Sequence, residues 1–106
     1  MSLIKVDPAK MAATLKETYR QAVQAHIDAT AAQRGYEAGH TLAGYTASAV
    51  PLWQAEAQAF VAWRDDVWLF VFDALAKIEA GEAAPPKNAE ALVALLPDIT
   101  WPERGD

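Results

Sequence analysis

The segment Gln54–Phe72 (QAEAQAFVAWRDDVWLFVF) most constrains what this 106-residue chain can fold into. It reads as one helix, and its later part carries nine large or branched apolar side chains: Phe60, Val61, Trp63, Val67, Trp68, Leu69, Phe70, Val71 and Phe72. At about 100° of rotation per residue, these side chains surround most of the helix. Because a helix that is apolar on most sides must be covered by several neighbours, we expect this one at the centre of the fold.

Helix-starting and helix-stopping residues divide the chain into three predicted helices, over about residues 8–34, 51–80 and 89–96. Pro8 and Pro51 are each preset for the first turn of a helix, and Asn88 can cap the third. Gly35 and Gly81 follow the two long helices, at positions where a residue that accepts positive φ is favoured. The pattern predicts an all-α fold: an antiparallel hairpin of two long helices, a short third helix and an extended C-terminal tail.

We expect a single helical domain over 1–106, with 1–7 and 103–106 loose. The connection 36–50 contains Gly, Thr and Ser and is long for a hairpin loop. Long loops are usually functional or locally packed, and we expect a short helical turn within 38–45.

The net charge of −5 argues against nucleic-acid binding, which requires clustered Lys and Arg. Residues 55–106 carry four basic and ten acidic side chains, a net −6, which we interpret as a solvated acidic surface. Attraction to the first half across the hairpin and contact with a basic partner are the alternatives. The absence of cysteine excludes disulfides and thiolate metal sites. The longest apolar run, Val67–Phe72, is far shorter than the roughly 20 residues of a membrane span. We therefore expect neither a membrane span nor a signal peptide.

Patterns typical of catalytic or metal sites are weak. His26 and His40 fall on different elements, and the one Glu-x-x-Glu pair, Glu79 and Glu82, is interrupted by Gly81. No Ser/His/Asp arrangement and no Gly-rich phosphate loop is present. We expect no catalytic, cofactor-binding or metal-binding residues and no cofactor.

The triplet Arg64-Asp65-Asp66 interrupts the most apolar part of the central helix. Asp65 and Asp66 point about 100° apart on a straight helix, so they do not form one carboxylate pair. We interpret the triplet as a solvent-facing strip, with Arg64 stacking on a tryptophan. A polar interface contact is the alternative.

Four tryptophans stand out in so small a chain. Trp53, Trp63 and Trp68 are expected in the core. Trp101 lies in the tail after Ile99, beside a proline, and is expected to pack on the central helix; clamping a neighbouring subunit is the sharper alternative. The expected site for the tail is a second apolar stripe formed by Val61, Trp68, Phe72 and Leu75.

Three segments, Val23–Glu37 (VQAHIDATAAQRGYE), Leu52–Glu82 (which contains QAEAQAFVAWRDDVW) and Glu90–Pro102 (EALVALLPDITWP), carry a family resemblance. They resemble small proteins, and C-terminal segments of larger ones, encoded near the tail and tail-fibre genes of tailed phages and prophages. The A-W-R-x-x-V-W block is the most specific part. The resemblance implies a tail-associated or assembly role and no catalytic residues. Glu37-Ala38-Gly39-His40 departs from the Asp-Ser-Ile-like continuation of that family, which puts partner specificity at this loop in doubt.

The resulting expectation is a non-enzymatic phage or prophage structural or tail-assembly protein. It would act through protein–protein contacts, with itself as a homodimer, with tail proteins or with both, in the bacterial cytoplasm during assembly or in the virion. The expected interface residues are Trp63, Val67, Trp68, Phe72 and Trp101. Two alternatives stay open: a small helical ligand-binding protein or enzyme that uses the tryptophan cluster, and an acidic helical adaptor or regulator.

Overall fold

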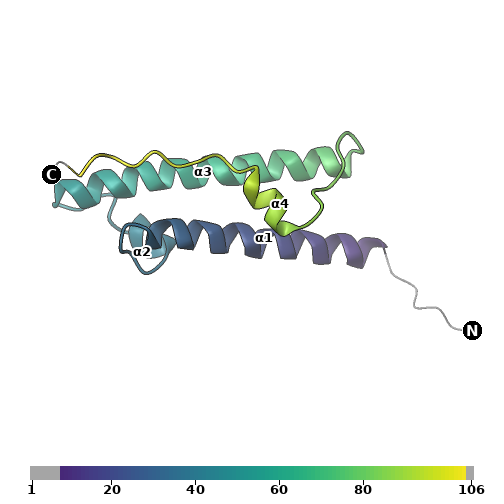
Figure 1. The fold of residues 1–106 in the computed structure, drawn as a ribbon, viewed down its shortest axis with the longest axis horizontal. Helices are drawn as coiled ribbons and strands as arrows, with labels where there is room; N and C mark the ends of the chain where they lie inside the picture. The colour runs from purple at the N-terminus through teal and green to yellow at the C-terminus, as the bar shows by residue number, and fades with distance from the viewer. Residues whose placement is uncertain (1–7, 105–106) are drawn as a thin grey trace, which may run out of the picture.

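The computed structural model describes residues 8–104 and, from residue 15 onward, their side chains. This part of the chain forms four helices and no strand (Figure 1). They are α1 (Pro8–Ala32), α2 (Gly39–Ala43), α3 (Pro51–Glu79) and α4 (Ala89–Ala94). The all-α prediction is confirmed, and each long helix ends within two residues of its predicted end.

Local signals explain the helix ends. Gly35 and Gly81 both adopt positive φ, at 90° and 75°. At α1, Tyr36 N–H then donates to the carbonyl of Ala31 at 3.3 Å, and the equivalent bond closes α3. Asn88 caps α4 as predicted, because its side chain accepts from Ala91 N–H at 2.7 Å.

The long helices α1 and α3 lie side by side and run in opposite directions (Figure 1). Helix α2 lies at the closed end of this hairpin and packs on both long helices. Helix α4 packs on α1, and the yellow C-terminal tail then returns along α3. The predicted hairpin crossed by a short helix and a tail is therefore found, with α2 as the predicted helical turn of the connection.

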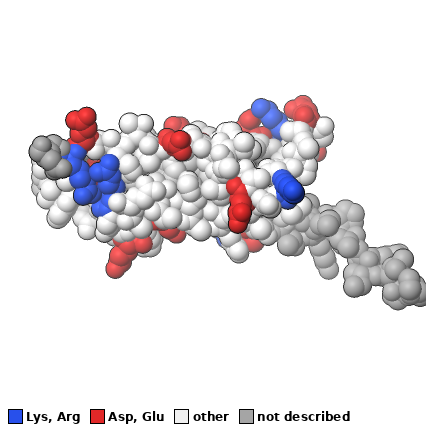
Figure 2. Space-filling model, viewed as in Figure 1, with Lys and Arg blue, Asp and Glu red and all other residues white. Residues whose placement is uncertain are grey.

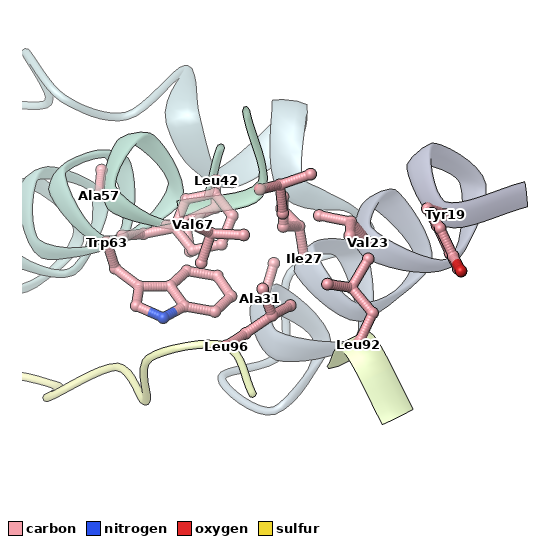
Figure 3. Close-up of a cluster of buried hydrophobic side chains, with 12 residues drawn as sticks. Tyr19, Val23, Ile27, Ala31, Leu42, Ala57, Trp63, Val67, Leu92 and Leu96 are labelled. Carbon is pink, nitrogen blue, oxygen red and sulfur yellow. The ribbon is translucent and has the colours of Figure 1, made fainter. Parts of the chain in front are cut away.

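The core lies between these elements, where α1 and α3 each contribute one apolar stripe. In Figure 3 the side chains of Val23 and Ile27 on α1 lie near Val67 on α3 and Leu42 on α2. Leu15, which continues the α1 stripe by sequence, is exposed. The buried apolar residues are Tyr19, Val23, Ile27, Ala31, Leu42, Ala57, Phe60, Trp63, Val67, Val71, Leu92 and Leu96.

Gly39 allows α2 to approach the long helices closely. A Cβ at this position would lie 3.1 Å from Ile27 Cγ2 and 3.2 Å from Phe60 Cζ, which is tighter than ordinary contact. The Gly39 N–H donates to Asp28 Oδ1 at 2.8 Å, so a free amide at the start of α2 gains an acceptor from α1. This contact joins the connection 36–50 to the core.

The C-terminal tail takes a different path from the one expected. Trp63 Nε1 donates to the carbonyl of Pro97 at 2.7 Å, and the Trp101 ring stacks on Phe60 with centroids 6.4 Å apart. The tail thus covers the stripe of α3 that contains Phe60 and Trp63, and the expectation of the second stripe is wrong. A buried indole N–H needs an acceptor, and the free carbonyl after α4 provides it.

Candidate functional site

Two of the five expected interface residues are enclosed by the chain itself. Trp63 is 6% exposed and packs against Phe60 and His26, and Val67 is fully buried. Both point from α3 into the space shared by α1, α2 and the tail. The expectation that Trp63 and Val67 meet a partner is therefore corrected, because α2 and the tail supply cover that was attributed to a second chain.

Trp68 and Phe72 lie on the opposite part of the helix and remain accessible. Phe72 is 61% exposed, its ring stacks on the half-buried Trp68 at 5.9 Å, and the neighbouring Leu69 is 67% exposed. Val61 and Leu75, the other members of this second stripe, are partly buried. We call the apolar residues of α3 between Phe60 and Phe72 its apolar girdle. The girdle is thus divided into a covered half, which contains Phe60, Trp63 and Val67, and an uncovered half, which contains Trp68, Leu69 and Phe72.

A groove of about 480 Å³ runs between α1 and this uncovered half of α3. Its lining is mainly apolar, and charged side chains of α1 stand at its edge. A shallower hollow continues from it towards Arg64 and Asp65, and the two share Arg20, Trp68 and Phe72. The groove residues are Lys16, Glu17, Arg20, Trp68, Val71, Phe72, Leu75, Ala76 and Glu79.

The charges at the groove edge are paired within the chain. Lys16 forms an ion pair with Glu79 across the groove. Arg20 binds Glu17 with two hydrogen bonds, at 2.5 and 2.9 Å, and these bonds are the main reason why the pKa of Glu17 falls to about 2. Glu17 therefore stays ionised at any pH near neutrality, and the groove has a polar edge around an apolar floor.

Trp101 packs on the central helix, as its first expectation had it, whereas Trp53 does not lie in the core. Trp101 is half-buried between Phe60 and the guanidinium of Arg34, which lies 5.1 Å from its ring centre. It is thus used for packing within the chain. Trp53 is 45% exposed, which corrects the core prediction. It lies in the first turn of α3 and has Tyr45 of the connection as its aromatic neighbour, at 5.6 Å.

Sequence reasoning missed a buried carboxylate, Glu56, which is 0% exposed. Arg104 donates to both of its oxygens, at 3.1 and 3.3 Å, and Arg34 lies 3.5 Å from Oε2. Tyr36 donates to Oε1 at 3.0 Å. We call these four residues the Glu56 cluster. A signal was present in the sequence, since Glu56 precedes Phe60 by four residues and Trp63 by seven and so shares their inward face.

The Glu56 cluster connects three distant parts of the chain: the end of α1, the first turns of α3 and the end of the tail. Figure 2 shows Lys and Arg side chains gathered beside the C-terminus on the face in view. Because Arg104 also donates to the carbonyl of Arg34 at 3.0 Å, it is held in place, and the expectation that 103–106 is loose is wrong for this residue. The expected loose segments 1–7 and 105–106 lie outside the described residues.

A depression of about 330 Å³ adjoins the Glu56 cluster and is lined partly by Trp53 and Tyr45. The Glu56 carboxylate, which lines this depression, is already bound by the other three members of the cluster. The arrangement therefore holds the tail on the helices, and we assign it a structural role.

The pKa of Tyr36 rises to about 12, first because the phenol is buried and then because it donates to the Glu56 carboxylate. The unfolded chain loses this proton near pH 10, whereas the folded chain keeps it. The stability that depends on Tyr36 is therefore fully present below about pH 10 and is lost as the pH rises towards about 12.

We predict that Tyr36→Phe reduces the loss of stability between about pH 9 and about pH 11. The measurement is urea unfolding of both proteins at each pH, and the readout is the change with pH rather than the absolute value. Equal changes in wild type and variant would contradict the assignment of this titration to Tyr36.

The triplet Arg64-Asp65-Asp66 and the histidine His26 also stand out in the sequence. Asp65 and Asp66 are exposed, as expected for a solvent strip. Arg64 lies 3.5 Å from Asp65. In the described part of the chain the cation–π pair is that of Arg34 with Trp101, so the expectation that Arg64 stacks on a tryptophan is not met. His26 packs edge-on against Trp63 at 5.8 Å. Within the described residues, no three His, Cys, Asp or Glu side chains are placed to hold a metal ion.

Residues of the segments Val23–Glu37 and Leu52–Glu82 meet one another in the fold. His26 contacts Trp63, and Tyr36 donates to Glu56. Comparison with protein-family models, curated proteins and solved structures found no match. No helix in the described part of the chain combines the length and apolar character needed to cross a bilayer.

Proposed function

We propose that the chain is a non-enzymatic protein-interaction domain that serves the assembly or structure of a phage or prophage tail. The observation that carries the interaction role is the uncovered half of α3. There Leu69 and Phe72 are largely exposed beside a groove of about 480 Å³. Neighbouring exposed apolar side chains with a polar edge are typical of protein contact surfaces.

The tail-associated part of the proposal is supported by the three sequence segments. Two contacts join the first two of these segments, since His26 packs on Trp63 and Tyr36 donates to Glu56. Residues that carry the resemblance therefore tie the first segment to the central helix. The partners are then products of neighbouring tail genes or a second copy of the chain. Assembly takes place in the bacterial cytoplasm, and the protein is either released or retained in the virion.

The test is affinity purification of the tagged chain co-expressed with the products of its neighbouring genes. We predict that Phe72→Glu reduces recovery of a specific partner at least tenfold, because a charge in the centre of an apolar contact must be desolvated. Ala25→Glu is the matched control, since it adds the same charge at an exposed position of α1. Equal recovery with all three proteins, or a genome neighbourhood without phage genes, would count against the proposal.

A ligand-binding function is the second candidate, and the groove itself favours it. Its volume lies in the range of small-molecule sites, and partly exposed Trp68 forms part of its wall. A small ligand bound there would change tryptophan fluorescence at stoichiometric concentration. It would also raise the stability of the wild type against unfolding more than that of Phe72→Glu. An acidic adaptor would instead require binding that depends on salt and on Asp65 and Asp66.

A further inference from the structure

We propose that the uncovered half of α3 pairs with the same surface of a second copy, with the two α3 helices antiparallel and Arg64 of each copy facing Glu79 of the other. This proposal rests on the proposed function, because it names the partner for the same face. It adds a register and a symmetry, and both can be tested.

The first argument is the arrangement of side chains around α3. At about 100° per residue, Arg64, Trp68, Phe72, Leu75 and Glu79 fall within roughly 80° of one another. They form a single stripe about 22 Å long. Its interior is apolar, with Phe72 exposed and Trp68 half-buried, and its two ends are charged.

The second argument is charge complementarity. The stripe begins with the cation Arg64 and ends with the anion Glu79, and two-fold symmetry between antiparallel helices brings unlike ends together. Midway between residues 64 and 79 lies Phe72, which would stand near the two-fold axis. A parallel pair would instead place Arg64 against Arg64 and Glu79 against Glu79, and like charges there oppose association.

The third argument is that both end charges can accept a further partner. The Glu79 side chain is 55% exposed even though it pairs with Lys16, and the Arg64 side chain is 34% exposed with Asp65 at 3.5 Å. The groove beside Trp68 and Leu75 supplies space for the Phe72 ring of the other copy. A second copy thus covers the apolar interior and adds two symmetric ion pairs at its edge.

The test is the dimer dissociation constant, from light scattering over a dilution series, of five proteins: the wild type, two single variants, the double variant and a control. Arg64→Glu and Glu79→Arg are each expected to weaken the dimer roughly tenfold or more, because each places like charges at both ends of the interface. The double variant Arg64→Glu/Glu79→Arg is expected to regain most of the affinity. Lys77→Glu is the control and is expected to leave the dissociation constant unchanged, since it reverses a charge on the same helix at an exposed position outside the stripe.

Rescue by the double variant supports the antiparallel register, and weakening in both single variants without rescue overturns it. The chain contains no cysteine, so Phe72→Cys gives an independent readout: oxidation is expected to join two copies at this position. Absence of the cross-link together with a monomeric wild type overturns the proposal. Loss of a tail-gene partner in Phe72→Glu with a monomeric wild type leaves the proposed function standing and rejects only the second copy as occupant.

Discussion

Replacing Glu56 with glutamine is expected to lower the free energy of unfolding by about 2–3 kcal/mol. Glu56 is fully buried and accepts hydrogen bonds from Tyr36 and Arg104. The amide removes the negative charge that the Arg34 and Arg104 guanidinium groups share, so Glu56 no longer offsets the repulsion between them. This loss of unfolding free energy is smaller than the loss usual for removing one partner of a fully buried ion pair. The reason is that the Arg34 and Arg104 side chains are 25% and 41% exposed and can be hydrated in the variant.

The measurement is urea unfolding followed by tryptophan fluorescence at neutral pH. Asp73→Asn is the matched control, because it also turns a carboxylate into an amide on the same helix, at the exposed ion pair with Lys77, and is expected to cost less than about 1 kcal/mol. Equal losses in the two variants would show that the Glu56 cluster contributes no more than a surface contact, and this would refute its role in holding the tail.

Phe60→Ala is expected to destabilise the chain by about 3–5 kcal/mol, the largest effect of any substitution considered for this fold. Its side chain is fully buried, and it meets Trp63 and Trp101. Phe60 Cζ also lies close to Gly39 of α2. Truncation would leave a cavity where α2, α3 and the tail meet. In a domain of this size such a loss can remove most of the total stability.

The matched control is Phe72→Ala, which makes the identical change twelve positions further along α3 at an exposed side chain. We expect it to change the stability of the monomer by less than about 1 kcal/mol and to weaken association instead. Unfolding should therefore be compared at concentrations below the dimer dissociation constant. Similar losses from the two substitutions would contradict the division of the apolar girdle into covered and uncovered halves.

Local chemistry made most of the helix ends predictable. Pro51 starts α3, Asn88 caps α4, and Gly35 and Gly81 adopt the positive φ that their positions after a helix suggested. Each of these signals acts within a few residues, so a single sequence displays it completely. The short helix α2 has no such cap, since Ala38 at its start offers no side-chain acceptor, and it was expected because long connections tend to pack locally.

The coverage of α3 was not predictable, because it depends on contacts between residues far apart in the chain. Arg104 and Glu56 are 48 positions apart, and Trp63 and Pro97 are 34 apart. Periodicity shows that the helix needs cover on most sides but not which segment covers which side. Sequence alone therefore assigns Trp63 and Val67 to a partner, although the tail and α2 enclose them. Trp68 and Phe72 remain candidates because no segment of the described chain covers their side of the helix completely.

The solution mass of the wild-type chain beside that of Phe72→Glu, from light scattering over a dilution series, tests the central claim most directly. That claim is that the uncovered half of α3 is a contact surface whose partner is a second copy. The account predicts a wild type with twice the chain mass that dissociates on dilution, and a folded Phe72→Glu that stays monomeric at every concentration. Equal masses for the two proteins at every concentration would contradict it.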